Sequence, residues 1–141
     1  MILDLHTHSK KSEDSRATVV GYLQWLLKKK DVLPIDGLVL LGYPLHPPGR
    51  PNQLRDAHLG AVRRPMLIVQ GERDTFGTPA ELKPVLARLR PTPSLHVIDG
   101  GDHSLKITRS DKRAQAAVYE SVQQRIVGWM RDVITRQPET G

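Results

Sequence analysis

Three compact apolar runs dominate the pattern of hydrophobic and polar positions along the chain. They occupy residues 35–44, 64–74 and 94–103 and read IDGLVLLGYP, RPMLIVQGERD and SLHVIDGGDH. The first run does not alternate between apolar and polar residues, which is typical of a strand covered on both faces, as in a parallel sheet. The other two runs are likewise expected to be buried strands. A shorter apolar segment at residues 2–5 is a fourth candidate strand.

The segments between these runs carry helical spacing. Residues 18–30 place apolar side chains three or four positions apart, and TPAE at 78–81 has the pattern of a capping box with proline at the first helical position. Pro84 is expected to bend or delay that helix, because proline lacks an N–H group and its ring clashes with the preceding turn. From residue 110 onward an apolar stripe predicts a long final helix that carries Ala117, Val118, Val122, Ile126, Trp129, Met130 and Val133.

Strands that alternate with helices predict the α/β class. We expect a layered, mostly parallel sheet of about four strands flanked by helices, in one compact unit for a chain of 141 residues. A sheet this small leaves an edge that must be covered or paired. Self-association through an exposed sheet edge is therefore one interaction to expect.

The composition and charge of the chain exclude several classes of function. The net charge of +6 permits weak adhesion to polyanions, but the Lys and Arg residues are scattered apart from 28–30, without the aromatic-interleaved basic surface that reads nucleic acid. The chain has no cysteine, which excludes disulfide and thiolate chemistry and fits a reducing compartment. The first residues lack the pattern of a secretory signal, and no apolar run approaches the ~18 residues that span a bilayer. We therefore expect a cytoplasmic protein that binds neither nucleic acid nor membrane.

The second and third of the compact runs end in polar loops, GERD at 71–74 and GGDH at 100–103. Serine hydrolases of the α/β type use the chain order nucleophile, acid, histidine, and Asp74 followed by His103 fits the last two places. The acid must orient the imidazole and stabilise its charged form, while the histidine takes the nucleophile's proton. Two local interpretations stand beside this one: Asp74 accepting turn amides, and His103 paired with Asp102.

A resemblance to a known family rests on three blocks in the right order, DGLVLLGYPLHPPGRPNQLRDAHL, PMLIVQGERDTFGTPAEL and LHVIDGGDHSLK. They resemble the carboxyl-terminal part of the α/β-hydrolase family that is related to dienelactone hydrolases and contains the testis-expressed and NSL-complex subunit hydrolase-like proteins. The resemblance implies an α/β-hydrolase-like unit over residues 34–141. It also implies a serine-type hydrolase of small ester or acyl substrates, with Asp74 as the triad acid and His103 as the triad base.

The nucleophile of that family is a serine in a Gly-x-Ser-x-Gly turn, which also supplies an oxyanion-hole amide, and this sequence contains no such pattern. Ser9, Ser12 and Ser15 lie in a charged polar run, and Ser104 is too close to His103 to present its hydroxyl easily to the same ring. The nucleophile is therefore unassigned. The alternative to an active enzyme is a non-catalytic interaction module that has kept the fold.

The first residues resemble a different family. LDLHTHSKKSEDSRATVVGYLQWL is similar to the opening of the PHP-domain family of metal-dependent phosphoesterases, which makes residues 1–33 a PHP-like segment. The resemblance implies that His6 and His8 bind a divalent metal, since positions i and i+2 of a strand share one side, with Asp4 able to support them. The next block of that family has the form DGIVLTEH, whereas this chain reads DGLVLLGYP and offers no ligand there. An ordinary polar strand is the alternative, and the hydrolase interpretation requires no cofactor.

One further histidine stands in a loop rich in proline. His46, in PLHPPG, belongs to a stiff turn near the predicted carboxyl end of its strand. It could line a pocket, but packing or solvation is the expected role.

Overall fold

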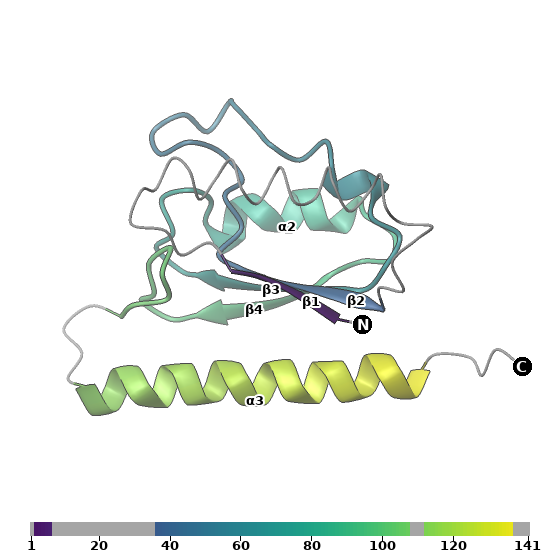
Figure 1. Ribbon diagram of the computed structural model, residues 1–141. Helices are drawn as coiled ribbons and strands as arrows, with labels where there is room; N and C mark the ends of the chain where they lie inside the picture. Colours follow the sequence, from purple (N-terminus) through teal and green to yellow (C-terminus); the bar gives the residue numbers. More distant parts are fainter. Residues whose placement is uncertain (1, 7–35, 108–111, 137–141) are drawn as a thin grey trace, which may run out of the picture.

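The computed structural model describes residues 2–6, 36–107 and 112–136, along which strands alternate with helices (Figure 1). The strands are β1 (Ile2–His6), β2 (Gly37–Leu41), β3 (Met66–Gly71) and β4 (Ser94–Ile98). The helices are η1 (Leu59–Ala61, a 3-10 turn), α2 (Pro79–Ala87) and α3 (Lys112–Arg136). The helix predicted over residues 18–30 lies outside the described residues.

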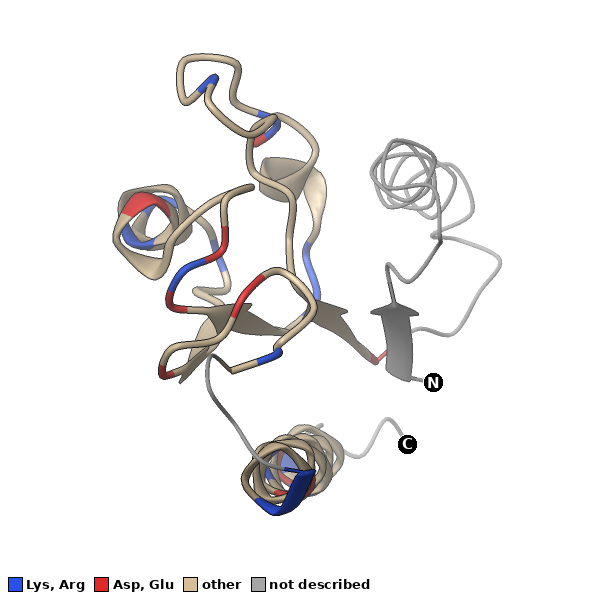
Figure 2. Cartoon of the chain, turned by 90° about the vertical axis from the view of Figure 1, so that its left-hand side faces the viewer, with Lys and Arg blue, Asp and Glu red and all other residues tan. Residues whose placement is uncertain are grey.

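All four strands run in parallel, in the spatial order β1-β2-β3-β4. The α/β class, the parallel direction and the number of strands are therefore as the sequence predicts. The parallel direction brings the carboxyl ends of the strands to one edge of the layer, which faces the viewer in Figure 2. β1 and β4 are the outer strands of the described sheet, and self-association through one of them stays a prediction.

Both faces of the sheet are buried at β2 and β3, which explains why these strands do not alternate between apolar and polar residues. The third run was expected to be a buried strand as well, but β4 is only half-buried except at Ile98. Leu38 and Ile68 belong to the core that α2 covers, whereas their neighbours Val39 and Leu67 belong to the core that α3 covers. Figures 1 and 2 show these two helices on opposite faces. Because side chains alternate across a strand, an apolar residue at every position supplies both cores.

The helix α2 begins with the predicted capping box. The Glu81 amide donates to Thr78 Oγ1 at 3.3 Å, and the Thr78 amide donates back to Glu81 Oε1 at 3.1 Å. The delay expected from Pro84 does not occur, since the helix starts at Pro79 and includes Pro84. Burial of Leu82 and its neighbours against the sheet outweighs the single N–H group that the proline lacks.

The helix α3 lies along the other face of the sheet. Six of the seven residues of its predicted stripe pack against the core, namely Val118, Val122, Ile126, Trp129, Met130 and Val133. Ala117 is the exception and is exposed. The helix runs opposite to the strands, so its C-terminal half lies beside their amino ends (Figure 1). Neither α2 nor α3 is long and apolar enough to cross a membrane.

Candidate active site at the carboxyl ends of the strands

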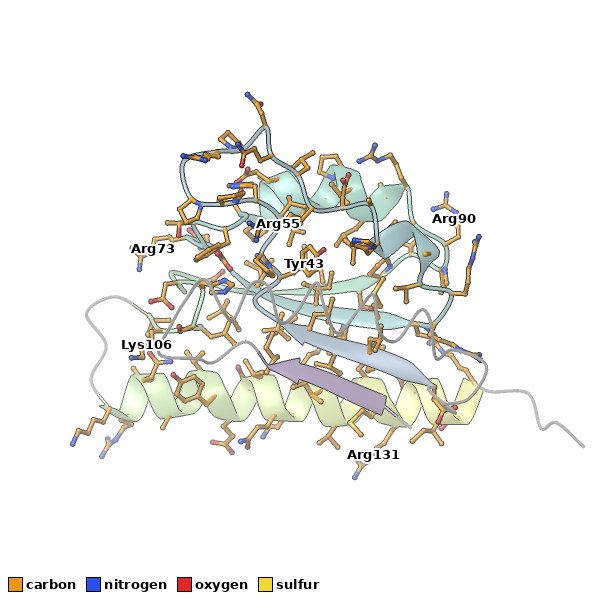
Figure 3. All side chains as sticks on the ribbon, turned by 45° about the horizontal axis from the view of Figure 1, so that its top comes forward. Tyr43, Arg55, Arg73, Arg90, Lys106 and Arg131 are labelled. Carbon is orange, nitrogen blue, oxygen red and sulfur yellow. The ribbon has the colours of Figure 1, made fainter. Side chains whose placement is uncertain are left out.

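Asp74 and His103 meet at the carboxyl end of the sheet. Asp74 lies three residues after β3, and His103 lies five residues after β4, the strand that pairs with β3. The distance between Asp74 Oδ2 and His103 Nδ1 is 2.8 Å, which makes this a hydrogen bond between a carboxylate and an imidazole. The exposed side chains of Arg73 and Lys106 mark the same end of the molecule in Figure 3. The two residues that the sequence singled out are thus brought together.

The carboxylate of Asp74 is enclosed completely, with 0% of its side chain exposed. Its Oδ1 accepts a hydrogen bond from the Phe76 amide at 2.8 Å, and its Oδ2 faces the imidazole. The residue therefore accepts a turn amide, as the local interpretation expects, and also binds His103. A buried carboxylate with both oxygens engaged holds an imidazole in one orientation and stabilises its positive charge.

The imidazole of His103 is more accessible than its partner, with 19% of the side chain exposed. Its ring centroid lies 4.4 Å from that of Phe76, whose ring packs against it at a tilt of 41°. Asp102 does not take the place of Asp74, because its Oδ1 accepts the amides of Ser104 and Lys106 at 2.8 and 2.9 Å. Since Nδ1 is bound to Asp74, Nε2 is the nitrogen at which this ring can exchange a proton with a substrate.

Close backbone packing supports the pair on its inner side. A Cβ atom at Gly42 would lie 2.6 Å from the His103 carbonyl oxygen and 3.3 Å from its ring, and Gly42 has a φ of +75°. A Cβ atom at Gly71 would overlap the carbonyl oxygen of Asp102. Only glycine lets the loops approach this closely. The sequence offered one signal for these two roles, a glycine at or directly after the end of a strand, which was not enough to assign them.

Gln70 connects the loops that surround the site. The side chain is fully buried at the end of β3, where Oε1 accepts the Tyr43 amide at 2.8 Å. Its Nε2 donates to the carbonyl oxygens of Tyr43 and Gly77 at 3.0 and 2.7 Å. The loop after β2 and the loop that carries Asp74 are thereby held by one amide group. Sequence reasoning missed this residue, for which a lone polar side chain in an apolar run was the only signal.

Tyr43 is a structural neighbour of the site rather than a base. Burial, reinforced by the negative charge of Asp56, raises the pKa of the Tyr43 phenol. The hydroxyl group donates to the carbonyl oxygen of Arg55. The phenol thus remains a neutral hydrogen-bond donor at physiological pH.

A second pair of histidine and carboxylate lies nearby. His46 follows β2 and is buried, with Nε2 at 2.6 Å from Glu81 Oε2 and Nδ1 at 2.8 Å from the Pro47 carbonyl oxygen. Both ring nitrogens are therefore engaged by groups of the protein. This confirms packing, the expected role, and adds an ion pair with the first turn of α2 that the sequence did not reveal.

The proposed metal ligands fall at the start of the chain. His6 is the last residue of β1 and therefore lies at the same edge of the sheet, whereas His8 is outside the described residues. Within the part of the chain that the structure describes, no group of three or more His, Cys, Asp or Glu residues is arranged to hold a metal ion. Metal binding by His6 and His8 stays a prediction.

A parallel α/β sheet with an acid and an imidazole in successive carboxyl-end loops is the arrangement of the α/β-hydrolase class. The chain belongs to the alpha/beta hydrolase domain family, whose profile matches residues 17–131. No solved structure was found to match the chain. The family match begins within the segment 1–33, and the PHP-like resemblance of that segment stays a prediction, as does membership of the dienelactone-hydrolase-related group.

Proposed function

We propose that this chain is a serine-type hydrolase of small ester or acyl substrates, with His103 as general base and Asp74 as the acid that orients it. The hydrogen bond of 2.8 Å between Asp74 and His103 carries the proposal. It supports that role because the carboxylate is buried, the imidazole is partly accessible, and the fold places both at the sheet edge where such sites lie. Membership of the hydrolase family supports the same chemistry.

The pair performs general-base catalysis in two proton transfers. His103 takes a proton at Nε2 from the attacking O–H group as the oxygen forms a bond to the acyl carbon. Asp74 stabilises the resulting imidazolium through Nδ1–H. The ring then returns the proton to the leaving alcohol as the ester bond breaks. Where the attacking oxygen is that of a serine, water then attacks the acyl-enzyme through the same two transfers, which releases the carboxylic acid and restores the serine hydroxyl; where it is water, the acid is released directly. Positioned bases of this kind accelerate reactions by about 10²–10⁴-fold.

The attacking oxygen comes either from a serine of this chain or from water. Ser104 is half-buried, and its amide donates to Asp102 at 2.8 Å. Ser9 follows β1 by three residues in the sequence, and β1 ends at the edge that holds the pair. Loss of turnover in Ser9→Ala or Ser104→Ala would assign the attacking oxygen to that serine, and unchanged turnover in both would favour water.

A model ester tests the proposal directly. p-Nitrophenyl acetate should be turned over by the protein, and His103→Ala and Asp74→Asn should each remove most of the turnover. A fluorophosphonate probe followed by peptide mass spectrometry identifies an activated serine, and labelling should disappear in His103→Ala. Turnover without labelling assigns the attack to water. Unchanged turnover in both variants would refute the acid–base pair.

The missing Gly-x-Ser-x-Gly turn favours one alternative, a non-catalytic interaction module. Absence of both turnover and labelling in the wild-type protein would support it. The metal-dependent phosphoesterase predicts instead a phosphatase activity that Mn²⁺ or Zn²⁺ switches on and a chelator abolishes. The same preparations can be assayed for all three activities.

A further inference from the structure

A second hollow lies at the end of the sheet opposite to Asp74 and His103. Its volume is about 500 Å³, and one wall includes Asp36, Met66 and Ser94, at the amino ends of β2, β3 and β4. The C-terminal half of α3 forms the other wall, because this helix runs opposite to the strands (Figure 1). Pockets that hold small molecules typically measure ~300–1,000 Å³, so this hollow has a suitable size.

The buried residues of the lining are apolar. Trp129 is only 6% exposed, and a Cβ atom at Gly37 would lie 2.8 Å from its Cη2 atom. The indole ring is therefore seated directly on the first residue of β2. Val133 and Pro65 extend this apolar lining. An apolar body that enters the hollow would exchange water for these surfaces.

Arginines surround the mouth of the hollow. Arg64 precedes β3, while Arg125 and Arg136 lie eleven positions apart on α3, which corresponds to three turns and places them on one helix face. All three are exposed, and none of their guanidinium groups forms an ion pair or hydrogen bond with the residues that the structure describes. Asp36 and Asp132 supply the acidic side chains of the lining, so the positive charges outnumber the negative ones.

The charge of Arg125 acts on the neighbouring strand β4. Burial lowers the pKa of His96 on β4, and the positive charge of Arg125 lowers it further. Arg131, on the same helix, points away from the sheet in Figure 3 and is absent from the lining of the hollow. The helix therefore presents some of its arginines to the hollow and at least one to solvent.

We propose that this hollow binds a small organic anion, in which a phosphate or carboxylate group is carried on an apolar body. Guanidinium groups present parallel N–H donors that fit two oxygens of either anion, and Arg64 and Arg125 approach from different walls. The apolar body contacts Trp129. Because the hollow and the Asp74–His103 pair lie at opposite ends of the strands, this site stands independently of the proposed hydrolase activity.

The indole signal of Trp129 reports on the site. The chain has two tryptophans, and Trp25→Phe identifies the signal of Trp129 in a ¹H–¹⁵N spectrum by elimination. Titration with phenyl phosphate or benzoate should shift that signal, whereas the neutral benzyl alcohol should not. The probe that binds more tightly identifies the anionic group. A signal unmoved by both anions, or moved equally by benzyl alcohol, would overturn the proposal.

Variants of exposed arginines give a matched comparison. Arg64→Ala and Arg125→Ala should each raise the Kd of the better probe by about tenfold, because each removes a charged hydrogen-bonding partner. Arg131→Ala removes the same charge outside the hollow and should leave the Kd unchanged. Circular dichroism verifies that all three variants are folded. Equal weakening by Arg131→Ala would mean that only net charge attracts the probe and would overturn the site.

Discussion

The described part of the chain contains two pairs of histidine and carboxylate with opposite burial. In the pair Asp74–His103 the acid is fully enclosed and the imidazole is 19% exposed, whereas in the pair His46–Glu81 the imidazole is 5% exposed and the acid 35%. The distances are similar, 2.8 and 2.6 Å, so the length of the hydrogen bond does not separate the two. The two pairs differ instead in the accessibility of the imidazole.

The partners of the second ring nitrogen complete the contrast. The ring of His46 has Glu81 at hydrogen-bond distance from one nitrogen and the Pro47 carbonyl oxygen at hydrogen-bond distance from the other. Such a ring connects the loop after β2 to α2 and has no nitrogen left for a substrate. The ring of His103 uses only Nδ1 for its acid, so its chemistry takes place at Nε2. The comparison teaches that a histidine–carboxylate contact indicates catalysis only where the imidazole keeps a nitrogen for the substrate.

The largest expected effect is on activity. Replacement of the base in His103→Ala should lower turnover of p-nitrophenyl acetate by about 10²–10⁴-fold, because general-base catalysis is lost. His46→Ala should leave the turnover of folded protein within about twofold, since its ring transfers no proton in the proposed mechanism. Steady-state kinetics on both variants measure the difference. Comparable losses in the two variants would erase the distinction between the pairs.

The next effect is on stability. His46→Ala removes a buried ring and leaves the Pro47 carbonyl oxygen and the Glu81 carboxylate without it. We expect the free energy of unfolding to fall by about 1–3 kcal/mol, as for other buried hydrogen-bonding groups that lose a partner. Urea denaturation followed by circular dichroism gives the value. An unchanged midpoint would show that this pair does not hold the loop to α2.

A smaller loss is expected where the helix α2 begins. Thr78→Ala removes the hydroxyl group that accepts the Glu81 amide and donates to Glu81 Oε1. Loss of such a cap costs about 1 kcal/mol. The thermal midpoint should therefore fall less than in His46→Ala, while esterase turnover stays at the wild-type value. A loss of turnover would mean that the first turn of α2 also positions Asp74.

The smallest expected effect is a change in how the free energy of unfolding depends on pH in acid. Burial raises the pKa of the Glu81 carboxyl, but hydrogen bonds from the Thr78 amide, the His46 ring and the Thr78 hydroxyl outweigh it and lower the pKa below its usual 4.5. A lowered pKa in the folded state contributes stability above pH 4.5 that is lost as the pH falls through the folded value. Because the carboxylate is 35% exposed, solvent screens this contribution.

Glu81→Gln should therefore remove part of the stability that wild-type protein loses on acidification. Urea midpoints measured for both proteins from neutral pH to below pH 4 give the comparison. Parallel curves would show that Glu81 titrates with the same pKa in both states. Asp132→Asn, an exposed carboxylate on α3 without a described ion pair, serves as the matched control.

The pattern of neighbouring residues in the sequence predicted much of the fold. The apolar runs gave all four described strands, and the capping box at Thr78 gave the start of α2. The meeting of Asp74 and His103 was also predictable, because loops that follow parallel strands emerge at one edge of a sheet. Of the bend or delay expected at Pro84, the delay was wrong, since helix propensity is a weak preference that packing against the sheet overrides, and the bend stays a prediction.

Contacts between residues that are far apart in the sequence were not predictable in the same way. His46 meets Glu81 across 35 positions of the chain, and Gln70 meets Tyr43 across 27. Nothing in the residues around either partner indicates the other. The hollow beside Trp129 is a further case, because its arginines come from the loop before β3 and from α3.

The sequence by itself determined which segments are strands and helices, and at which sheet edge an acid and a histidine would emerge. It did so because periodicity, capping and the direction of parallel strands are properties of neighbouring residues. The tertiary structure decided which histidine keeps a nitrogen for a substrate and where arginines surround an apolar hollow. Burial and three-dimensional proximity depend on how separate elements pack, and that information belongs to no single segment of the chain.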